Sequence, residues 1–214
     1  MSLLVKVALR NSSLSRAQLL EVEGEWHNHH PQVTLEPQFV LTMGDRDQNR
    51  SLRALDKSDF FTREIDDLLL AGDCRLAIHS AKDLPDPLPE GLVRVALTRG
   101  VDPRDALVLR CRPLPAQPIV ATSSVRRDEA VRALLPHARV VDIRGNVDQR
   151  LSRLASGEID ALVVAEAALI RLGLTHLERI YLEGPSAVHQ GRLALVARAD
   201  DFEMAALAAC LDTP

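Results

Sequence analysis

The chain has 214 residues, of which 46% are hydrophobic, and carries a formal net charge of −4 at pH 7. This length allows one domain with a substantial core or two domains of about 100 residues each. The negative charge argues against a general nucleic-acid binder, whose surface would carry positive potential. No apolar run approaches the roughly 18 residues of a membrane-spanning helix, and residues 1–9 resemble a strand and not a secretion signal. We therefore expect a soluble, cytoplasmic protein that binds neither nucleic acid nor membrane.

Nearly all of the basic charge of the chain is carried by arginine. Lys6, Lys57 and Lys82 are the only lysines. Guanidinium groups bind carboxylates and phosphates in a bidentate manner, so the arginine surplus fits an anionic ligand, although biased codon use explains it equally well. The cysteines lack the paired spacing of a zinc site, so we expect reduced thiols and no metal site. These cysteines are Cys74, Cys111 and Cys210.

Apolar periodicity divides the first half of the chain into alternating strands and helices. It predicts strands at residues 3–9, 33–41 and 75–79, and helices at residues 13–26 and 60–70. Ser12 or Ser13 can cap the first of these helices. Residues 42–58 are polar and aperiodic, which is typical of a long mobile loop, and such loops tend to be functional.

The alternation continues after the Asp102-Pro103 turn. The pattern predicts strands at residues 106–109, 119–121, 139–143, 161–164 and 193–197. It predicts helices at residues 124–135, 147–155, 167–172 and 202–211. Strands that alternate with helices favour parallel sheets flanked by helices, so the sequence predicts an α/β fold.

Asp83 directly follows the strand predicted at residues 75–79. Open α/β sheets present ligand-binding residues beyond the carboxyl ends of their strands, which makes Asp83 a candidate functional carboxylate. Asp83 also fits an ordinary turn, in which its side chain accepts hydrogen bonds from backbone N–H groups. Lys82 beside it is ambiguous, because a lysine that follows a strand is usually solvated. His79 lies in the apolar strand, which favours a hydrogen-bonded core histidine over a catalytic one.

The segment ATSSVRR, residues 121–127, joins a predicted strand to a predicted helix. Backbone N–H groups, hydroxyls and the positive end of the helix favour a carboxylate or phosphate at such a junction. Arg126 and Arg127 would oppose the helix dipole in the first turn unless an anion or a carboxylate partner compensates. The segment is therefore either an anion site or a simple helix cap. The glycine spacing of a nucleotide-binding loop is absent, which counts against ATP or a dinucleotide.

A third junction is IRGNVDQRL, residues 143–151, with Arg144 at the strand end and Arg150 two turns later. Taken with Asp83 and the ATSSVRR segment, it predicts a site that combines one acid with several guanidinium groups. A substrate with several carboxylates would require such a site.

These segments resemble the ordered motif set of the porphobilinogen deaminases (hydroxymethylbilane synthases). The agreement in order and spacing runs from ALRNSSLSRAQ through MGD, FFTRE, HSAKDLP, DPRDALV, ATSSVRR, RGN and RLGL to the HQG segment. Each motif alone is modest, but their joint occurrence over nearly the whole chain is very specific.

The resemblance implies two α/β domains similar to type II periplasmic binding proteins, with the active cleft between them and two hinge crossings. The first domain, with the catalytic aspartate, would comprise residues 1–97 and 188–214, and the arginine-rich second domain residues 98–187. The family joins four porphobilinogen molecules head to tail, loses ammonia from each, and releases the linear tetrapyrrole hydroxymethylbilane in haem biosynthesis. Porphobilinogen or a polypyrrole is thus the implied ligand.

The resemblance also implies roles for individual residues. Asp83 matches the catalytic aspartate, which would steer protons and stabilise the cationic azafulvene formed when the aminomethyl group departs. A further set of residues matches positions that hold the acetate and propionate groups or the dipyrromethane cofactor. This set is Arg10, Ser12, Ser80, Lys82, Thr122, Ser123, Arg126, Arg127, Arg144, Arg150 and Arg171.

The sequence departs from the family pattern in three places. Ser58 stands where the family has a lysine in its mobile loop, with Lys57 one place earlier, and residues 189–192 read HQGR where the family has GQGA. The sequence ends at residue 214, whereas a typical member continues into a third domain whose cysteine carries the covalent dipyrromethane primer. No cysteine here matches that one, so we expect no covalently bound cofactor, and a separate third domain could be a partner.

Two functions of different classes stay open. The chain is either an enzyme of pyrrole condensation or a non-catalytic binding module for a tetrapyrrole or other polycarboxylate. Asp83 favours the enzyme, because anion binding gains nothing from a carboxylate in the site. The missing primer attachment favours the binding module.

Overall fold

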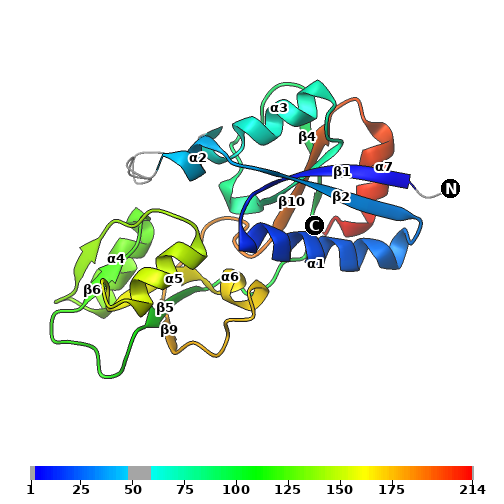
Figure 1. The fold of residues 1–214 in the computed structure, drawn as a ribbon. Helices are drawn as coiled ribbons and strands as arrows, with labels where there is room; N and C mark the ends of the chain where they lie inside the picture. Colours follow the sequence, from blue (N-terminus) through cyan, green and yellow to red (C-terminus); the bar gives the residue numbers. More distant parts are fainter. Residues whose placement is uncertain (1–2, 48–58, 214) are drawn as a thin grey trace. The chain divides into compact units, whose positions relative to one another are not determined.

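The computed structural model describes residues 3–47 and 59–213, and the contacts among them divide the chain into two compact units. The first unit consists of residues 3–46, 59–101 and 192–213, and the second of residue 47 with residues 102–191. The long excursion into the second unit therefore begins after Val101 and ends before Arg192. The sequence predicts these crossings after residues 97 and 187. Figure 1 shows each unit as a sheet flanked by helices.

The sheet of the first unit is mixed and has the strand order β2-β1-β3-β10-β4. β1 runs parallel to β2 and β3, whereas β10 runs antiparallel to β3 and β4. Because neighbouring parallel strands end at the same sheet edge, the residues that follow β1 and β3 meet there. The strands are β1 (Leu3–Arg10), β2 (Val33–Val40), β3 (Leu76–Ser80), β4 (Leu92–Leu97) and β10 (Leu193–Arg198).

Helices cover both faces of this sheet. Trp26 of α1 belongs to the core on one face, together with residues of α7, and Ile65 of α3 belongs to the core on the other. The alternation along β1 feeds both cores, since Val7 faces the first and Ala8 the second. The helices are α1 (Ser13–His29), α2 (Met43–Arg46), α3 (Arg63–Ala71) and α7 (Phe202–Ala208).

The second unit repeats this layout with the strand order β7-β6-β8-β5-β9. β6 is parallel to β7 and β8, and β5 is antiparallel to β8 and β9. Leu154 and Leu169 of α5 and α6 belong to one core, and Val131 of α4 to another. The elements are β5 (Asp105–Leu109), β6 (Ile119–Ala121), α4 (Val125–Leu134), β7 (Arg139–Val141), α5 (Val147–Ala155), β8 (Ala161–Ala165), α6 (Glu166–Arg171) and β9 (Arg179–Tyr181).

The structure corrects several details of the sequence prediction. The sheets are not parallel but mixed, because β10 and β5 enter them antiparallel. The strands β4 and β9 are missing from the prediction. Exposed residues interrupt β4 and none of the three residues of β9 is fully buried, so both carry a weak apolar signal. The loop expected at residues 42–58 begins with the helix α2, and its remainder from residue 48 lies outside the described residues.

Two predicted helices also have different ends. The one expected from residue 60 begins at Arg63, because residues Asp59–Phe61 form the 3₁₀ turn η2 and Thr62 precedes the helix. The helix expected at residues 202–211 changes to the 3₁₀ turn η4 (Ala209–Leu211) after Ala208. The start of α1 is settled in favour of Ser12, whose Oγ accepts a hydrogen bond from the Ser15 backbone N at 3.1 Å.

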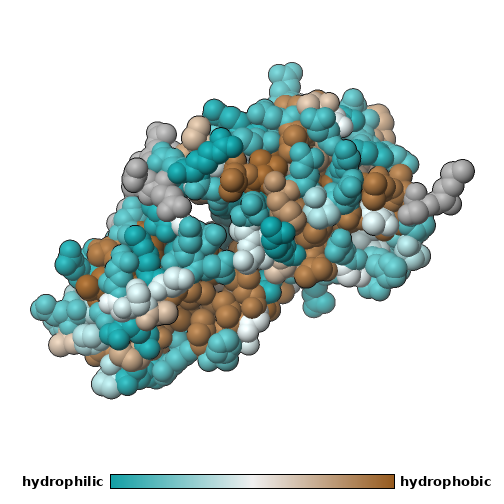
Figure 2. All heavy atoms as spheres, viewed as in Figure 1, coloured by the Kyte–Doolittle hydropathy of each residue, from teal (hydrophilic) through white to brown (hydrophobic). Residues whose placement is uncertain are grey.

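Apolar side chains also reach the surface, as the brown areas in Figure 2 show. The exposed ones belong to different elements, such as Leu20 of α1 and Phe202 at the start of α7, and single exposed apolar residues are ordinary in proteins. Within residues 3–47 and 59–213, none of the helices has both the length and the apolar character needed to cross a bilayer.

Candidate functional site

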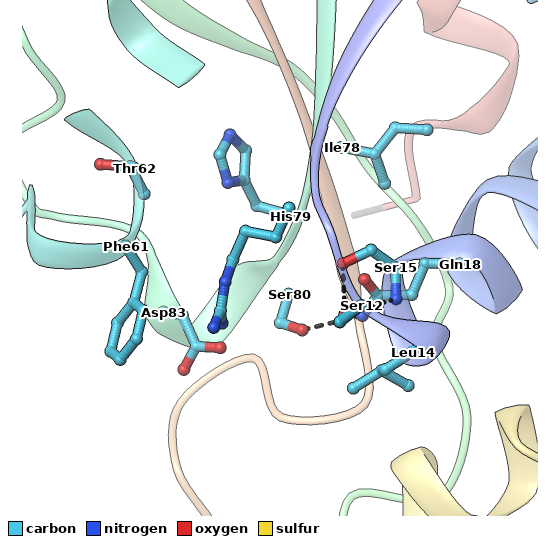
Figure 3. Close-up of a pocket in the computed structure, with 11 residues that line it drawn as sticks. Ser12, Leu14, Ser15, Gln18, Phe61, Thr62, Ile78, His79, Ser80 and Asp83 are labelled. Carbon is cyan, nitrogen blue, oxygen red and sulfur yellow. Dashed lines mark hydrogen bonds between the residues drawn. The ribbon is translucent and has the colours of Figure 1, made fainter. Parts of the chain in front are cut away.

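A pocket opens in the first unit, where β1 and β3 end and α1 begins (Figure 3). Its volume of about 70 Å³ would hold several water-sized groups. Four of the predicted site residues line it, namely Arg10, Ser12, Ser80 and Asp83. The remaining lining residues are Leu14, Ser15, Gln18, Phe61, Thr62, Ile78 and His79.

The guanidinium of Arg10 is held in place from two sides. Its Nη2 donates a short hydrogen bond to Asp45 Oδ1, and its Cζ lies 4.4 Å from the centroid of the Phe61 ring. Asp45 in turn accepts hydrogen bonds from the Thr42 backbone N at 3.1 Å and from Thr42 Oγ1 at 2.8 Å. Burial alone would raise the pKa of Asp45, but the bonds to Arg10 and Thr42 outweigh it and lower that pKa. The guanidinium of Arg10 is therefore held in one position in the absence of a ligand.

Hydroxyl and amide groups line the opposite wall of the pocket. Ser12 Oγ lies 2.9 Å from Ser15 Oγ, and Gln18 Nε2 donates to Ser80 Oγ at 2.8 Å. Gln18 is buried, and its bond to Ser80 links α1 to the end of β3. Figure 3 shows these side chains converging from the helix and the strand. Such hydroxyls can donate to carboxylate oxygens of a ligand.

Asp83 ends the 3₁₀ turn η3 (Ala81–Asp83), directly after β3. Its side chain is exposed and lines the pocket. No hydrogen bond or ion pair joins its carboxylate to any residue in the described ranges, so the backbone N–H bonds expected of an ordinary turn aspartate are not made. Lys82, its neighbour, is half-buried and is not among the lining residues.

His79 is a buried residue in the wall of the pocket. Burial lowers the pKa of His79 to about 4, and the nearby charge of Arg10 acts in the same direction, so the ring is neutral at neutral pH. The expectation of a buried histidine holds, but the expectation of a hydrogen-bonded one does not. Its Nε2 has no hydrogen-bond partner among the described residues.

In the second unit, the ATSSVRR segment connects β6 to α4. Ser124 caps α4 by accepting a hydrogen bond from the Arg127 backbone N at 3.4 Å. Ser123 Oγ is bonded to the backbone of Ile143, donating to its carbonyl and lying 3.2 Å from its N. Thr122 is buried. Capping of α4, one of the two roles left open for this segment by the sequence, is therefore made by Ser124, while Ser123 bridges to the segment that follows the neighbouring strand β7.

Arg126 and Arg127 have a carboxylate partner within the chain. Asp105, at the start of β5, forms ion pairs with Arg126 Nη2 at 2.6 Å and with Arg127 Nη2 at 2.7 Å. Burial would raise the pKa of Asp105, but Arg127, Gln190 and Arg126 outweigh this effect and lower it. The sequence required either an anion or a carboxylate of the chain to offset two arginines in the first turn of α4. The structure provides a carboxylate, that of Asp105.

The other predicted arginines of the second unit are half-buried and bind backbone carbonyls. Arg144 Nη2 donates to the oxygen of Asp47 at 2.7 Å, and Arg150 Nε to that of Gly145 at 2.8 Å. Arg171 Nη2 donates to the oxygen of Gly191 at 2.8 Å. Gly145 is required there, because its φ is +98° and an added Cβ would lie 2.6 Å from Gln149 Oε1.

A family model described as "Porphobilinogen deaminase, dipyromethane cofactor binding domain" matches residues 5–206. The chain belongs to the porphobilinogen deaminase family. It is 41% identical over 213 residues to a porphobilinogen deaminase of Roseiflexus sp. (strain RS-1), covering 96% of this chain and 70% of the relative. It is 37% identical over 219 residues to that of Chromobacterium violaceum, covering 98% of this chain and 70% of the relative. The family predicted from the motifs is confirmed.

Solved structures support the predicted fold of this porphobilinogen deaminase homologue. Lipoprotein Tp32 of Treponema pallidum matches with a TM-score of 0.60 and 15% identity, over 98% of this chain and 91% of that chain. The reduced OxyR regulatory domain of Pseudomonas aeruginosa matches with a TM-score of 0.55 and 13% identity, over 98% and 97%. At these identities the likeness concerns the fold alone, and it confirms two α/β units of the type II periplasmic-binding-protein kind.

Of the residues that depart from the family pattern, the structure describes those of the HQGR segment. Arg192, in the HQGR segment, donates to the backbone oxygens of Thr98 at 2.6 Å and Leu97 at 3.1 Å, and it also binds Thr213. It thus ties three segments of the first unit together. Lys57 and Ser58, predicted for the mobile loop, lie outside the described residues.

Several residues around these sites were not found from the sequence. They are Asp45, Phe61, Gln18, Asp105 and Gln190. A usable signal existed for Gln18, because it is a polar residue on the helix face that also carries the buried Leu19, Val22 and Trp26. Asp105 had no such signal, since it lies 22 positions before Arg127 in the sequence.

Asp66 of α3 gives a prediction for stability against pH. Burial raises the pKa of Asp66 from 3.8 to about 6, so the folded state binds its proton more tightly than the unfolded state. Stability is therefore lost as pH rises from 4 to 6. We expect Asp66→Asn to raise the free energy of unfolding at pH 7.5 by about 1–2 kcal/mol, allowing for partial solvent screening.

Chemical denaturation at several pH values tests this expectation, and the gain should vanish near pH 4 because the wild-type carboxyl is then protonated. The control is Asp73→Asn, an exposed aspartate just beyond the end of α3 whose charge does not contribute to the raised pKa of Asp66. A gain that stays constant from pH 4 to pH 8 would contradict the link to ionisation.

Proposed function

We propose that this chain catalyses the head-to-tail condensation of porphobilinogen, with loss of ammonia, towards hydroxymethylbilane. The observation that carries the proposal is the carboxylate of Asp83, exposed in a pocket with an ordered guanidinium and several hydroxyls. A carboxylate without a partner among the described residues is available to a ligand. Family membership adds the substrate class, since relatives carry the name porphobilinogen deaminase.

In the proposed reaction, Asp83 acts on the aminomethyl carbon of porphobilinogen. The C–N bond breaks and the nitrogen leaves with the bonding pair as ammonia, after protonation. The positively charged methylene pyrrole that remains is stabilised by the negative carboxylate. A new C–C bond then forms with the free α-carbon of a second pyrrole, and the proton displaced from that carbon passes to a base, a role that Asp83 can fill.

The acetate and propionate groups of the substrate are proposed to bind the predicted basic and hydroxyl residues. In the first unit these are Arg10, Ser12, Ser80 and Lys82. In the second unit they are Thr122, Ser123, Arg126, Arg127, Arg144, Arg150 and Arg171. We further propose that the two contact units correspond to the two domains expected from the resemblance, one with the catalytic aspartate and one with most of the arginines.

By charge and hydrogen bonding, the first-unit pocket suits carboxylate groups of the family's dipyrromethane. Arg10, Ser12 and Ser80 provide donors for its carboxylates, and Lys82 lies two positions after Ser80 in the sequence. When bound, the dipyrromethane supplies the pyrrole end from which the chain grows. The residues that line this pocket include no cysteine, so they provide hydrogen-bond donors for the dipyrromethane and no thiol for its covalent attachment.

The direct test is incubation of the purified chain with porphobilinogen while ammonia and tetrapyrrole are followed. Release of both supports the proposal. Binding of porphobilinogen without ammonia release would overturn it and support the binding-module alternative, in which the arginines hold a polycarboxylate without chemistry.

We predict that this 214-residue chain carries no thioether-linked dipyrromethane. Cys74 is fully buried and Cys210 is half-buried against the core, and burial raises the pKa of both thiols, which lowers their reactivity. Cys111 is exposed, but it does not line the pocket in which the dipyrromethane is proposed to bind. The intact mass measured by electrospray should therefore equal the sequence mass, and the colour reaction for dipyrromethane should be negative. An adduct on Cys74, Cys111 or Cys210 would contradict this prediction and reveal another way of anchoring the primer.

A further inference from the structure

Asp105 is bound by side chains from two other segments of the second unit. Its Oδ1 accepts hydrogen bonds from Arg127 Nε at 2.9 Å and Gln190 Nε2 at 2.9 Å, and its Oδ2 pairs with Arg126 Nη2 at 2.6 Å. Only 4% of the residue is exposed. Gln190 also accepts a hydrogen bond from Arg127 Nη2 at 3.3 Å, so two of the three partners of Asp105 are connected to each other.

The cluster of Asp105, Arg126, Arg127 and Gln190 offsets unfavourable positive charge at the start of α4. Two adjacent guanidinium groups lie in the first turn, where the helix dipole already favours negative charge. The lowered pKa of Asp105 keeps its carboxylate ionised at neutral pH. Two positive charges and one negative charge leave the cluster with one net positive charge, which complements one ligand carboxylate.

The two arginines differ in what they leave for a ligand. Arg127 binds Asp105 through two nitrogens, and its side chain is only 11% exposed. The side chain of Arg126 is 32% exposed; it uses Nη2 for Asp105 and Nη1 for the backbone oxygen of Pro185 at 2.6 Å. Since a guanidinium carries five N–H donors, Arg126 keeps donors that can face a ligand.

We propose that Asp105 is a positioning residue, which fixes the guanidinium of Arg126 before a ligand carboxylate arrives and uses Arg127 and Gln190 as its own anchors. Ordering a long side chain in advance removes an entropic cost from binding. The identity of the ligand as porphobilinogen rests on the proposed function, whereas the ordering of the arginines does not.

The first test needs no ligand. In a ¹⁵N-labelled sample of the whole chain, the Nε–H signal of Arg127 should exchange slowly with water, because Asp105 accepts that proton. Asp105→Asn should speed its exchange by at least about tenfold, a change expected when a charged hydrogen bond is weakened. The control is Asp128→Asn, which breaks a similar pair with Arg132 on the same helix at 2.5 Å. Unchanged exchange in Asp105→Asn would overturn the proposal.

The second test measures porphobilinogen binding by calorimetry in a double-mutant cycle. Asp105→Asn should weaken binding about 5- to 30-fold, but should add little in the background of Arg126→Gln, because Asp105 acts through Arg126. Tighter binding in Asp105→Asn would mean that the carboxylate only reduces positive charge, and additive losses would mean that it acts independently. Both results would overturn the proposal.

Two further outcomes distinguish failure of the proposed function from failure of the proposed role of Asp105. If the wild-type chain does not bind porphobilinogen, the proposed function fails and the exchange measurement alone decides the role of Asp105. If Asp105→Asn prevents folding, Gln190→Leu takes its place, because it keeps the carboxylate and removes one anchor. That variant should also speed Arg127 exchange and weaken binding, and the absence of both effects would overturn the proposal.

Discussion

Asp83→Asn should abolish the release of ammonia from porphobilinogen while the protein binds this ligand with equal or slightly greater affinity. The substitution keeps the shape of the side chain and removes its negative charge. Electrostatic and acid–base contributions of one such group are worth at least about 100-fold in rate. Because the carboxylate is exposed and makes no bond to the described residues, its loss leaves no buried partner unsatisfied.

Three measurements on the same preparations test this expectation: ammonia release, calorimetric binding and the thermal midpoint of unfolding. Asp86→Asn is the matched control, because Asp86 is also exposed, lies in the same loop and does not line the pocket. If ligand binding and the midpoint fall together in Asp83→Asn, Asp83 is a structural turn residue and the proposed role is wrong.

Arg126→Leu and Arg127→Leu should each weaken the binding of porphobilinogen or a tetrapyrrole far more than Arg94→Leu. A charge-assisted hydrogen bond is worth about 1.5–3 kcal/mol, which corresponds to roughly 10- to 150-fold in affinity. Arg94 provides the comparison because it is an exposed residue of β4 outside the motifs. Calorimetry on the three variants checks the order.

The two arginine variants should differ in stability. Arg127→Leu removes the partner that makes two contacts with the buried Asp105, whereas Arg126→Leu removes the more exposed partner. We therefore expect a lower unfolding midpoint in Arg127→Leu and little change in Arg126→Leu. Equal losses of affinity at Arg94, Arg126 and Arg127 would contradict the assignment of these arginines to carboxylate binding.

Much of the fold was predictable because its signals are local. The alternation in residues 3–9, the serine before residues 13–26 and the apolar run before Asp83 each depend on neighbouring residues, and β1, α1 and β3 follow them closely. The same holds for α5, whose capping box joins Asn146 to Gln149. The antiparallel entry of β10 and β5 could not be predicted this way, because it depends on which distant strands pair.

In the candidate site, too, the features with local sequence signals could be predicted and those that depend on distant partners could not. Arg10, Ser12, Ser80 and Asp83 could be predicted to meet, because strand ends of one sheet share an edge. The side-chain contacts that fix Arg10 and the arginines of the second unit could not be predicted. The bond of Arg10 to Asp45 spans 35 positions, and that of Gln190 to Asp105 spans 85, so no local pattern connects these partners.

The place of β10 has a consequence for synthesis of the protein. This strand lies inside the first sheet, between β3 and β4, yet it follows residues 102–191 in the chain. On the ribosome, the second unit emerges almost as one continuous stretch and can begin to fold at once, while the first sheet waits for its inner strand. Until β10 arrives, β3 and β4 each present an unpaired edge of the kind that promotes aggregation. A translational stop before Leu193 should therefore yield an insoluble product.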